Sequence, residues 1–172
     1  MAAPATEKKK ASLRDLLLLA ALALIIAAGA YMSLHRANGA DDYTMLPIEK
    51  ISIKTKEGKA DLEVEIAEKQ MDIKIGLMFR KSMPENHGML FQLGRDDPHT
   101  ANFWMKETYI PLDIIFVAKD GSIVNIHRNA RPLDITPIPS LQPVTGVIEV
   151  NAGVADALGI AVGDKVLHKY FE

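Results

Sequence analysis

The chain has 172 residues, with 20 basic and 22 acidic side chains, one tryptophan and no cysteine. The lack of cysteine excludes disulfides, thiolate metal sites, a cysteine nucleophile and a lipidated cysteine anchor. Residues 1–40 hold five of the basic and two of the acidic residues, so residues 41–172 carry a net charge of −5. This acidic balance, with no basic stripe, argues against a nucleic-acid partner.

The N-terminus has the pattern of an export signal. Lys8, Lys9, Lys10 and Arg14 precede an uncharged run over residues 16–34. A basic segment before an apolar run is typical of a secretory signal, and its positive charge stays on the cytoplasmic side. We therefore expect the rest of the chain to lie outside the cytoplasm, either periplasmic or secreted.

Cleavage and retention of this leader are both compatible with the sequence. The run of 19 residues is about long enough to cross a bilayer as a helix. Small residues at 28–30 and, more weakly, at 37–40 offer cleavage sites. Residues 1–40 are thus either a signal peptide or an anchor that holds the protein in the inner membrane through residues 16–34.

A short tether is expected over residues 41–47, followed by a single β-domain over residues 48–172. The segment KISIKT alternates Ile51 and Ile53 with polar residues, and DLEVEIAE continues the alternation from Leu62. A period of two with one apolar face predicts half-buried strands. The KEGK segment between them supplies the turn of a hairpin.

The next segment favours a short helix. In AEKQMDIKIGLMFRKSM, Met71, Ile75, Met78 and Phe79 recur at helical spacing, although Gly76 interrupts the run. The short apolar segment GMLFQL then predicts a strand.

The stretch NFWMKETYIPLDIIF contains the only tryptophan of the chain. We expect NFWMKE and LDIIFV to pair antiparallel across TYIP, which places Lys106 opposite Asp113 and Trp104 opposite Ile115. The KDGS turn predicts a second hairpin between LDIIFV and IVNIHR.

The C-terminal part adds an extended loop and two strands. NARPLDITPIPSLQPVT holds four prolines and should form the loop. GVIEVNAG and VGDKVLHKY predict strands, with one or two helical turns in VADALGI between them. The predicted fold class is mostly β, a single compact antiparallel β-sandwich or barrel with one or two short helices, preceded by an N-terminal hydrophobic helix.

Three fragments in this order carry a family resemblance: GLMFRKSMPENHGMLF, FWMKETYIPLDIIFVAKDGSIVNI and VIEVNAGVADALGIAVGDKV. Across residues 60–168 the chain resembles the DUF192 family, an uncharacterised ancient conserved region. The resemblance implies a compact, mostly antiparallel β fold, often behind a signal peptide or anchor, and no established reaction, cofactor or ligand. Where the pattern WMKNT is expected this chain has WMKET, so Glu107 adds a negative charge beside Lys106.

Five side chains are candidates for binding a small polar ligand: Arg80, Trp104, Lys106, Asp113 and Glu149. A carboxylate inside the apolar run LDIIF is costly if it is buried alone, and Lys106 is its nearest expected partner. Two interpretations remain open. The pair forms the polar floor of a pocket walled by Trp104, or it serves structure as an internal ion pair or a turn cap.

Glu149 interrupts an apolar strand and shares a face with Val147, so it is expected to be partly buried. Together with Asp113 it would supply the two facing carboxylates that glycoside hydrolysis needs. Arg80 either binds an anionic ligand or lies exposed at the C-terminus of the predicted helix.

A possible copper site comes from Met83, His87 and Met89, because thioether and imidazole ligands suit Cu(I). Methionine is also an ordinary core residue, and the spacing matches no strong metal motif.

The sequence therefore predicts an exported binding or accessory domain for a small polar ligand such as a sugar, rather than an enzyme. A carbohydrate-active hydrolase using Asp113 and Glu149, a copper-binding domain, and a structural or protein-interaction domain are the alternatives. The chain holds no Walker loop, G-x-S-x-G elbow or H-E-x-x-H motif, and the sequence requires no cofactor.

Overall fold

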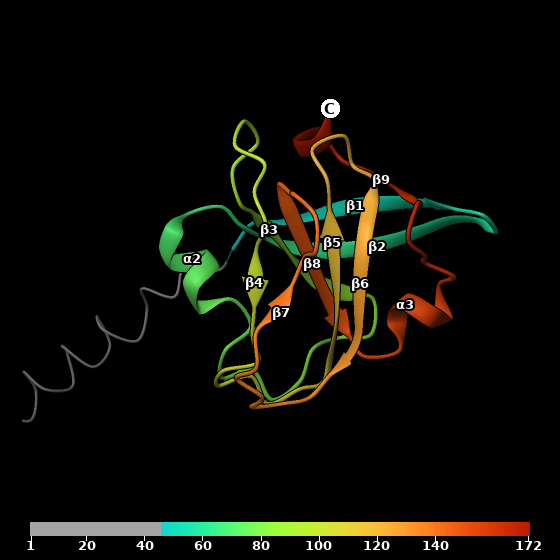
Figure 1. Ribbon diagram of the computed structural model, residues 1–172. Helices are drawn as coiled ribbons and strands as arrows, with labels where there is room; N and C mark the ends of the chain where they lie inside the picture. The colour runs from blue at the N-terminus through green and yellow to red at the C-terminus, as the bar shows by residue number, and fades with distance from the viewer. Residues whose placement is uncertain (1–45) are drawn as a thin grey trace, which may run out of the picture. The chain divides into compact units, whose positions relative to one another are not determined.

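The computed structural model describes residues 46–172 (Figure 1). The leader over residues 1–40 and most of the predicted tether lie outside the described residues. Within the described part, every helix is too short or too polar to cross a membrane.

Short strands dominate the described chain. They are β1 (Ile48–Thr55), β2 (Gly58–Ala67), β3 (His87–Gln92), β4 (Asn102–Phe103), β5 (Leu112–Val117), β6 (Ile123–Ala130), β7 (Ile138–Pro139), β8 (Gly146–Asn151) and β9 (Lys165–Leu167). The helices are α2 (Gln70–Ile75), α3 (Val154–Ala157) and the 3-10 turn η1 (Lys169–Phe171).

Within residues 46–172, seven strands form one sheet in the order β6-β5-β8-β3-β2-β1-β9. The sheet curls into a half-barrel, and a bridge from Ser122 to Lys165 brings its two edges together. The mostly-β fold with two short helices is thus confirmed. The expectation of a wholly antiparallel sheet is wrong, because β2 and β3 run parallel. The chain crosses from one to the other through α2, so both strands point the same way.

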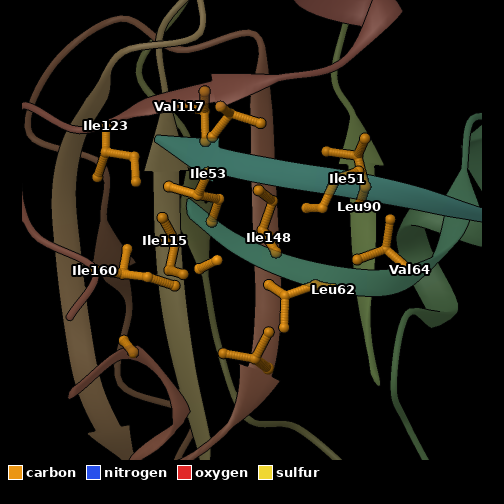
Figure 2. Close-up of a cluster of buried hydrophobic side chains, with 14 of the residues drawn as sticks. Ile51, Ile53, Leu62, Val64, Leu90, Ile115, Val117, Ile123, Ile148 and Ile160 are labelled. Carbon is orange, nitrogen blue, oxygen red and sulfur yellow. The ribbon is translucent and has the colours of Figure 1, made fainter. Parts of the chain in front are cut away.

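The first of two core clusters fills the inside of the curl (Figure 2). Strand alternation explains it, since every second residue of a strand faces the same side. Ile51 and Ile53 of β1 are fully buried here, as are Leu90 of β3, Ile115 of β5 and Ile148 of β8. Each such side chain contributes about 1.5–3 kcal/mol on burial.

The other face of the sheet is covered by α2 and by the small β4–β7 ribbon, which lies in front of β3 and β8 in Figure 1. Phe103 of β4 packs edge-on against Phe91 and Phe116 of the sheet, with ring centroids 5.1 and 6.0 Å apart. These rings belong to the second core cluster. The sheet therefore has two buried faces, and a pocket forms where the second face is incompletely filled.

The predicted hairpin across TYIP is wrong. β4 pairs with β7, whereas β5 pairs with β6 and β8. Asp113 lies opposite Val150, and Ile115 lies opposite Ile126 and Ile148, so neither faces Lys106 or Trp104. The physical reason is a turn after Trp104, in which the Thr108 N–H donates to the Met105 carbonyl at 3.1 Å.

The predicted amphipathic helix is shorter than its pattern suggests. α2 ends at Ile75 because Gly76 adopts φ 51° and ψ −132°, a conformation suited to glycine. Met71 and Phe79, expected on the buried face, are 61% and 55% exposed. Met71 lies in α2, whereas Phe79 belongs to the turn that follows the helix.

Candidate functional site

A pocket of about 360 Å³ lies between the second face of the sheet and its covering layer. One wall is α2 with the turn that follows it, and the opposite wall is β4 with its flanking segments. Phe91 and Glu149 are the lining residues that β3 and β8 of the main sheet contribute. The full lining consists of residues 73–78, Phe91, Leu93, residues 99–104, Lys106, Thr108 and Glu149.

The alternation of β8 explains why a glutamate reaches this pocket. Ile148 and Val150 point into the half-barrel core, so Glu149 and its neighbour Val147 point to the second face. Across the sheet, Glu149 lies opposite Met89 on β3 and Ile114 on β5, both fully buried. Glu149 is therefore a single carboxyl group set among apolar side chains.

Glu149 is only 4% exposed. Within residues 46–172, its side chain has no hydrogen-bond donor or ion-pair partner. Burial disfavours the charged form and raises the pKa of Glu149 to about 8. At neutral pH the carboxyl is therefore mostly protonated, and it can both donate and accept a hydrogen bond at the pocket wall.

Aromatic and cationic side chains border the opening of the pocket. Trp104 is 51% exposed, so part of the indole faces solvent. Lys74 and Lys106 are exposed lining residues. His99 is also exposed, and its Nδ1 lies 2.8 Å from the Asp97 carbonyl oxygen. The pocket thus combines an apolar interior, a buried acid and an aromatic border.

Three of the five predicted ligand-binding residues meet in this pocket: Trp104, Lys106 and Glu149. The other two lie elsewhere and have partners of their own. Arg80 forms an ion pair with both carboxylate oxygens of Glu65. The pair is partly buried, and it fixes the turn after α2 to β2.

Asp113 holds backbone groups in place. Its carboxylate accepts hydrogen bonds from the N–H groups of Asn129, Gly153 and Ala155 at 2.9, 2.9 and 3.0 Å. Three such bonds satisfy a buried carboxylate without a cation. Asp113 therefore has a structural role, which was one of the two interpretations of the sequence. It fulfils this role through backbone N–H groups and not through an ion pair with Lys106.

The proposed pairing of Asp113 with Glu149 as two hydrolytic carboxylates is wrong. Glu149 lies directly opposite Ile114 in the register of β5 and β8. Asp113 is the neighbour of Ile114 on the same strand, so its side chain points to the other face of the sheet. The sheet separates the two carboxyl groups, and they share no cleft.

The residues of the possible copper site lie in and beside the second core cluster. Met89 is 1% exposed, and Met83 packs against the same cluster. His87 pairs with Glu63, with 3.0 Å between Nε2 and Oε2. Among residues 46–172, no three His, Asp or Glu side chains gather as a metal site. The placements favour packing for both methionines, and the copper site stays a prediction.

Known protein families and solved structures that resemble this chain support the fold described above and the family resemblance of its sequence motifs. The DUF192 family model, described as an uncharacterized ACR, matches residues 52–168. This chain belongs to the DUF192 family. A search of curated proteins finds no match to it.

Two crystal structures resemble this DUF192 domain, each with a TM-score of 0.69. One is a protein of Sinorhizobium meliloti described as a candidate transcription regulator, 39% identical, with 72% of this chain and 95% of that chain covered. The other is a protein of unknown function from Novosphingobium aromaticivorans, 40% identical, with 73% of this chain and 89% of that chain covered.

Most other residues that line the DUF192 pocket could not be recognised from the sequence as site residues. Residues 73–78 had the pattern of a core helix, and Phe91 and Phe103 that of strand interiors. One signal was present in Gly76, which breaks the helical run. A Cβ atom at this position would lie 3.0 Å from the Phe91 ring, so a larger residue would require the ring or the pocket wall to shift.

Proposed function

We propose that this domain is an exported binding module for a small polar ligand held between α2, β4 and β8. One observation carries the proposal: Glu149, 4% exposed and without a partner in the described chain, lines an apolar-walled pocket. Buried polar groups in proteins are usually hydrogen-bonded. A ligand that reaches Glu149 would supply the missing bond.

The lining fits a ligand that has an apolar face and a polar group. The exposed indole of Trp104 offers a flat surface on which such a face, for a sugar the face of the ring, would stack. The volume of about 360 Å³ lies at the small end of ligand pockets, which favours a ligand about the size of one ring.

Binding is better supported than hydrolysis because Asp113 and Glu149 lie on opposite faces of the sheet. A role in transcription regulation, by analogy with the S. meliloti relative, is less well supported, because the net charge of −5 on residues 41–172 disfavours contact with nucleic acid. The export part of the proposal rests on the basic and apolar leader.

The first experiment is native mass spectrometry on the protein purified from the envelope fraction of its own cells. We expect a chain that begins near residue 31 or 41, or the full chain if the leader is an anchor, together with an organic adduct. Recovery from the cytosolic fraction would contradict export.

Ligand-detected NMR with the adduct, or with a panel of monosaccharides, then locates the site. Trp104→Ala should weaken binding about tenfold, the value of one good stacking contact. Val162→Ala, which also truncates an exposed apolar side chain, is the matched control and should leave binding unchanged. Equal binding by both variants would place the ligand elsewhere, and the absence of both adduct and binding would overturn the proposal.

A further inference from the structure

The lining of the pocket narrows the class of ligand, on the condition that the proposed binding function is correct. We infer that the ligand is a small organic amine, whose positively charged amino group binds the Glu149 carboxylate. Amino sugars belong to this class and also fit the exposed indole of Trp104.

The first argument is the isolation of the acid. A charged carboxylate in an apolar site is stabilised only by a partner of opposite charge or by several N–H donors. Asp113 has three N–H donors, and Glu65 has Arg80. Within the described residues, Glu149 has neither, so a cationic ligand would gain more here than at any other carboxyl of the sheet.

The second argument is the strength of the bond that each kind of ligand would make. An ammonium group and a carboxylate form a charge-assisted hydrogen bond, roughly twice as strong as a neutral one. A hydroxyl group would bond the protonated Glu149 and gain only the weaker kind. The pocket therefore discriminates in favour of the amine.

Aromatic rings give the ammonium group a second attraction. Phe91, Phe103 and Trp104 all line the pocket, and the rings of Phe91 and Phe103 meet edge-on with centroids 5.1 Å apart. A cation within about 6 Å of a ring face is attracted to the π electrons. A neutral hydroxyl group gains much less from the same rings.

The other charged groups around the pocket affect how strongly a cation is attracted to it. Lys74 of α2 and Lys106 beside β4 are exposed lining residues and oppose it, as would His99 when protonated. Glu107, in the place of an expected asparagine, lies outside the pocket lining, and its carboxylate accepts a hydrogen bond from the Tyr109 hydroxyl at 3.1 Å.

Two further charged residues lie in the row of cross-strand neighbours that contains Ile114, Glu149 and Met89. Glu65 on β2 lies opposite Met89 and is neutralised by Arg80, and His127 on β6 lies opposite Ile114. Glu149 is thus the one carboxyl of this row that is without a cation.

Amine binding has a characteristic dependence on pH. The ammonium group binds the ionised carboxylate, so binding expels a proton from Glu149, whose pKa in the free protein is about 8. The affinity for an amine that stays protonated over this range, such as benzylamine, should therefore rise between pH 6 and pH 8, by up to about tenfold per pH unit. A ligand that uses the protonated acid would show the opposite trend and weaken above pH 8.

The test compares two pairs of similar size by isothermal titration calorimetry at pH 7: benzylamine with benzyl alcohol, and glucosamine with glucose. We expect the amine of at least one pair to bind ten or more times more tightly than its neutral partner. Glu149→Gln should abolish this preference, whereas Glu85→Gln, at an exposed glutamate outside the pocket lining, should leave it unchanged.

Proton release gives a second readout that does not depend on a variant. At pH 7, amine binding should release most of one proton per site to the buffer. The measured heat of binding should therefore change with the ionisation enthalpy of the buffer, in proportion to the number of protons released. Equal or tighter binding by the neutral partners, or no proton release, overturns the inference and leaves the binding function standing. If none of the four probes binds, the amine inference fails, and the search for an organic adduct decides the binding function separately.

Discussion

Arg80 donates to both carboxylate oxygens of Glu65, with 2.6 Å between Nη1 and Oε1. This ion pair joins the turn after α2 to the C-terminal end of β2. Its side chains are 32% and 17% exposed, so solvent screens it less than a pair on the open surface. Since α2 and this turn form one wall of the pocket, the pair positions that wall against the sheet.

Arg80→Met should therefore destabilise the domain and loosen the pocket wall. We expect a loss of about 1–2 kcal/mol in the free energy of unfolding, because charge-assisted bonds at partly buried sites are lost. Urea denaturation measures the change. The matched control is Lys59→Met, which breaks an ion pair between side chains that are 58% and 66% exposed. It should cost less than about 0.5 kcal/mol, and similar losses in both variants would contradict the assigned role of Arg80.

Glu149 should make the stability of the domain depend on pH. Its pKa is about 8 in the folded state and near 4.5 when unfolded, so between these values the folded state holds the extra proton. The contribution of Glu149 to the free energy of unfolding should therefore be most favourable below pH 4.5. It should fall as the pH rises and level off above pH 8. The slope approaches about 1.4 kcal/mol per pH unit, or on the order of 5 kcal/mol in total.

Glu149→Gln isolates this contribution, because the amide has a similar shape and does not titrate. The variant and the parent should unfold with similar free energies near pH 4.5, and the variant should be several kcal/mol more stable at pH 8. Urea unfolding curves at pH 5, 6.5 and 8 measure the difference. Parallel pH profiles of the two proteins would show that Glu149 is ionised at neutral pH in the folded state.

Asp113→Ala should damage folding without affecting the pocket directly. The substitution leaves three N–H groups, of Asn129, Gly153 and Ala155, without their acceptor. We expect a loss of about 3–5 kcal/mol in the free energy of unfolding. Ligand affinity measured on the folded fraction should stay within about twofold of the parent value. A large loss of affinity with unchanged stability would reverse this assignment.

Local sequence patterns predicted the strands better than their partners. The alternation around Ile51 and Ile53 and the turn signals KEGK and KDGS identified two hairpins, and both are present. The pairing of β5 with β8 joins residues far apart in the chain, and no local period encodes it. Lys106 and Asp113 were paired because they are close in sequence, whereas the turn at Glu107 leads β4 and β5 to different partner strands.

The candidate site was predictable to the extent that one residue violated its local pattern. Glu149 in an apolar strand was such a violation, and it lines the pocket. Asp113 was the same kind of violation, yet backbone N–H groups satisfy it. Which of the two acids lacks partners depends on the face of the sheet and on distant turns, and both depend on tertiary structure. The wall formed by α2 was hidden because its apolar spacing also suits a core helix.

Gly76→Ala tests how closely the pocket wall must approach the sheet. At φ 51° and ψ −132° a side chain is strained, and a Cβ atom would also lie 3.0 Å from the Phe91 ring. We expect a loss of about 3 kcal/mol or more in the free energy of unfolding, from backbone strain and crowding together. Gly163→Ala is the matched control, since φ is also positive at 94° but no atom lies within 4 Å of the added Cβ. It should cost only the backbone strain, about 1 kcal/mol.

The α2 wall should also move away from Phe91 in the Gly76→Ala variant. Changed NMR chemical shifts of the Phe91 ring would report this movement. Equal stability losses in the two variants would show that the contact with Phe91 does not constrain the wall.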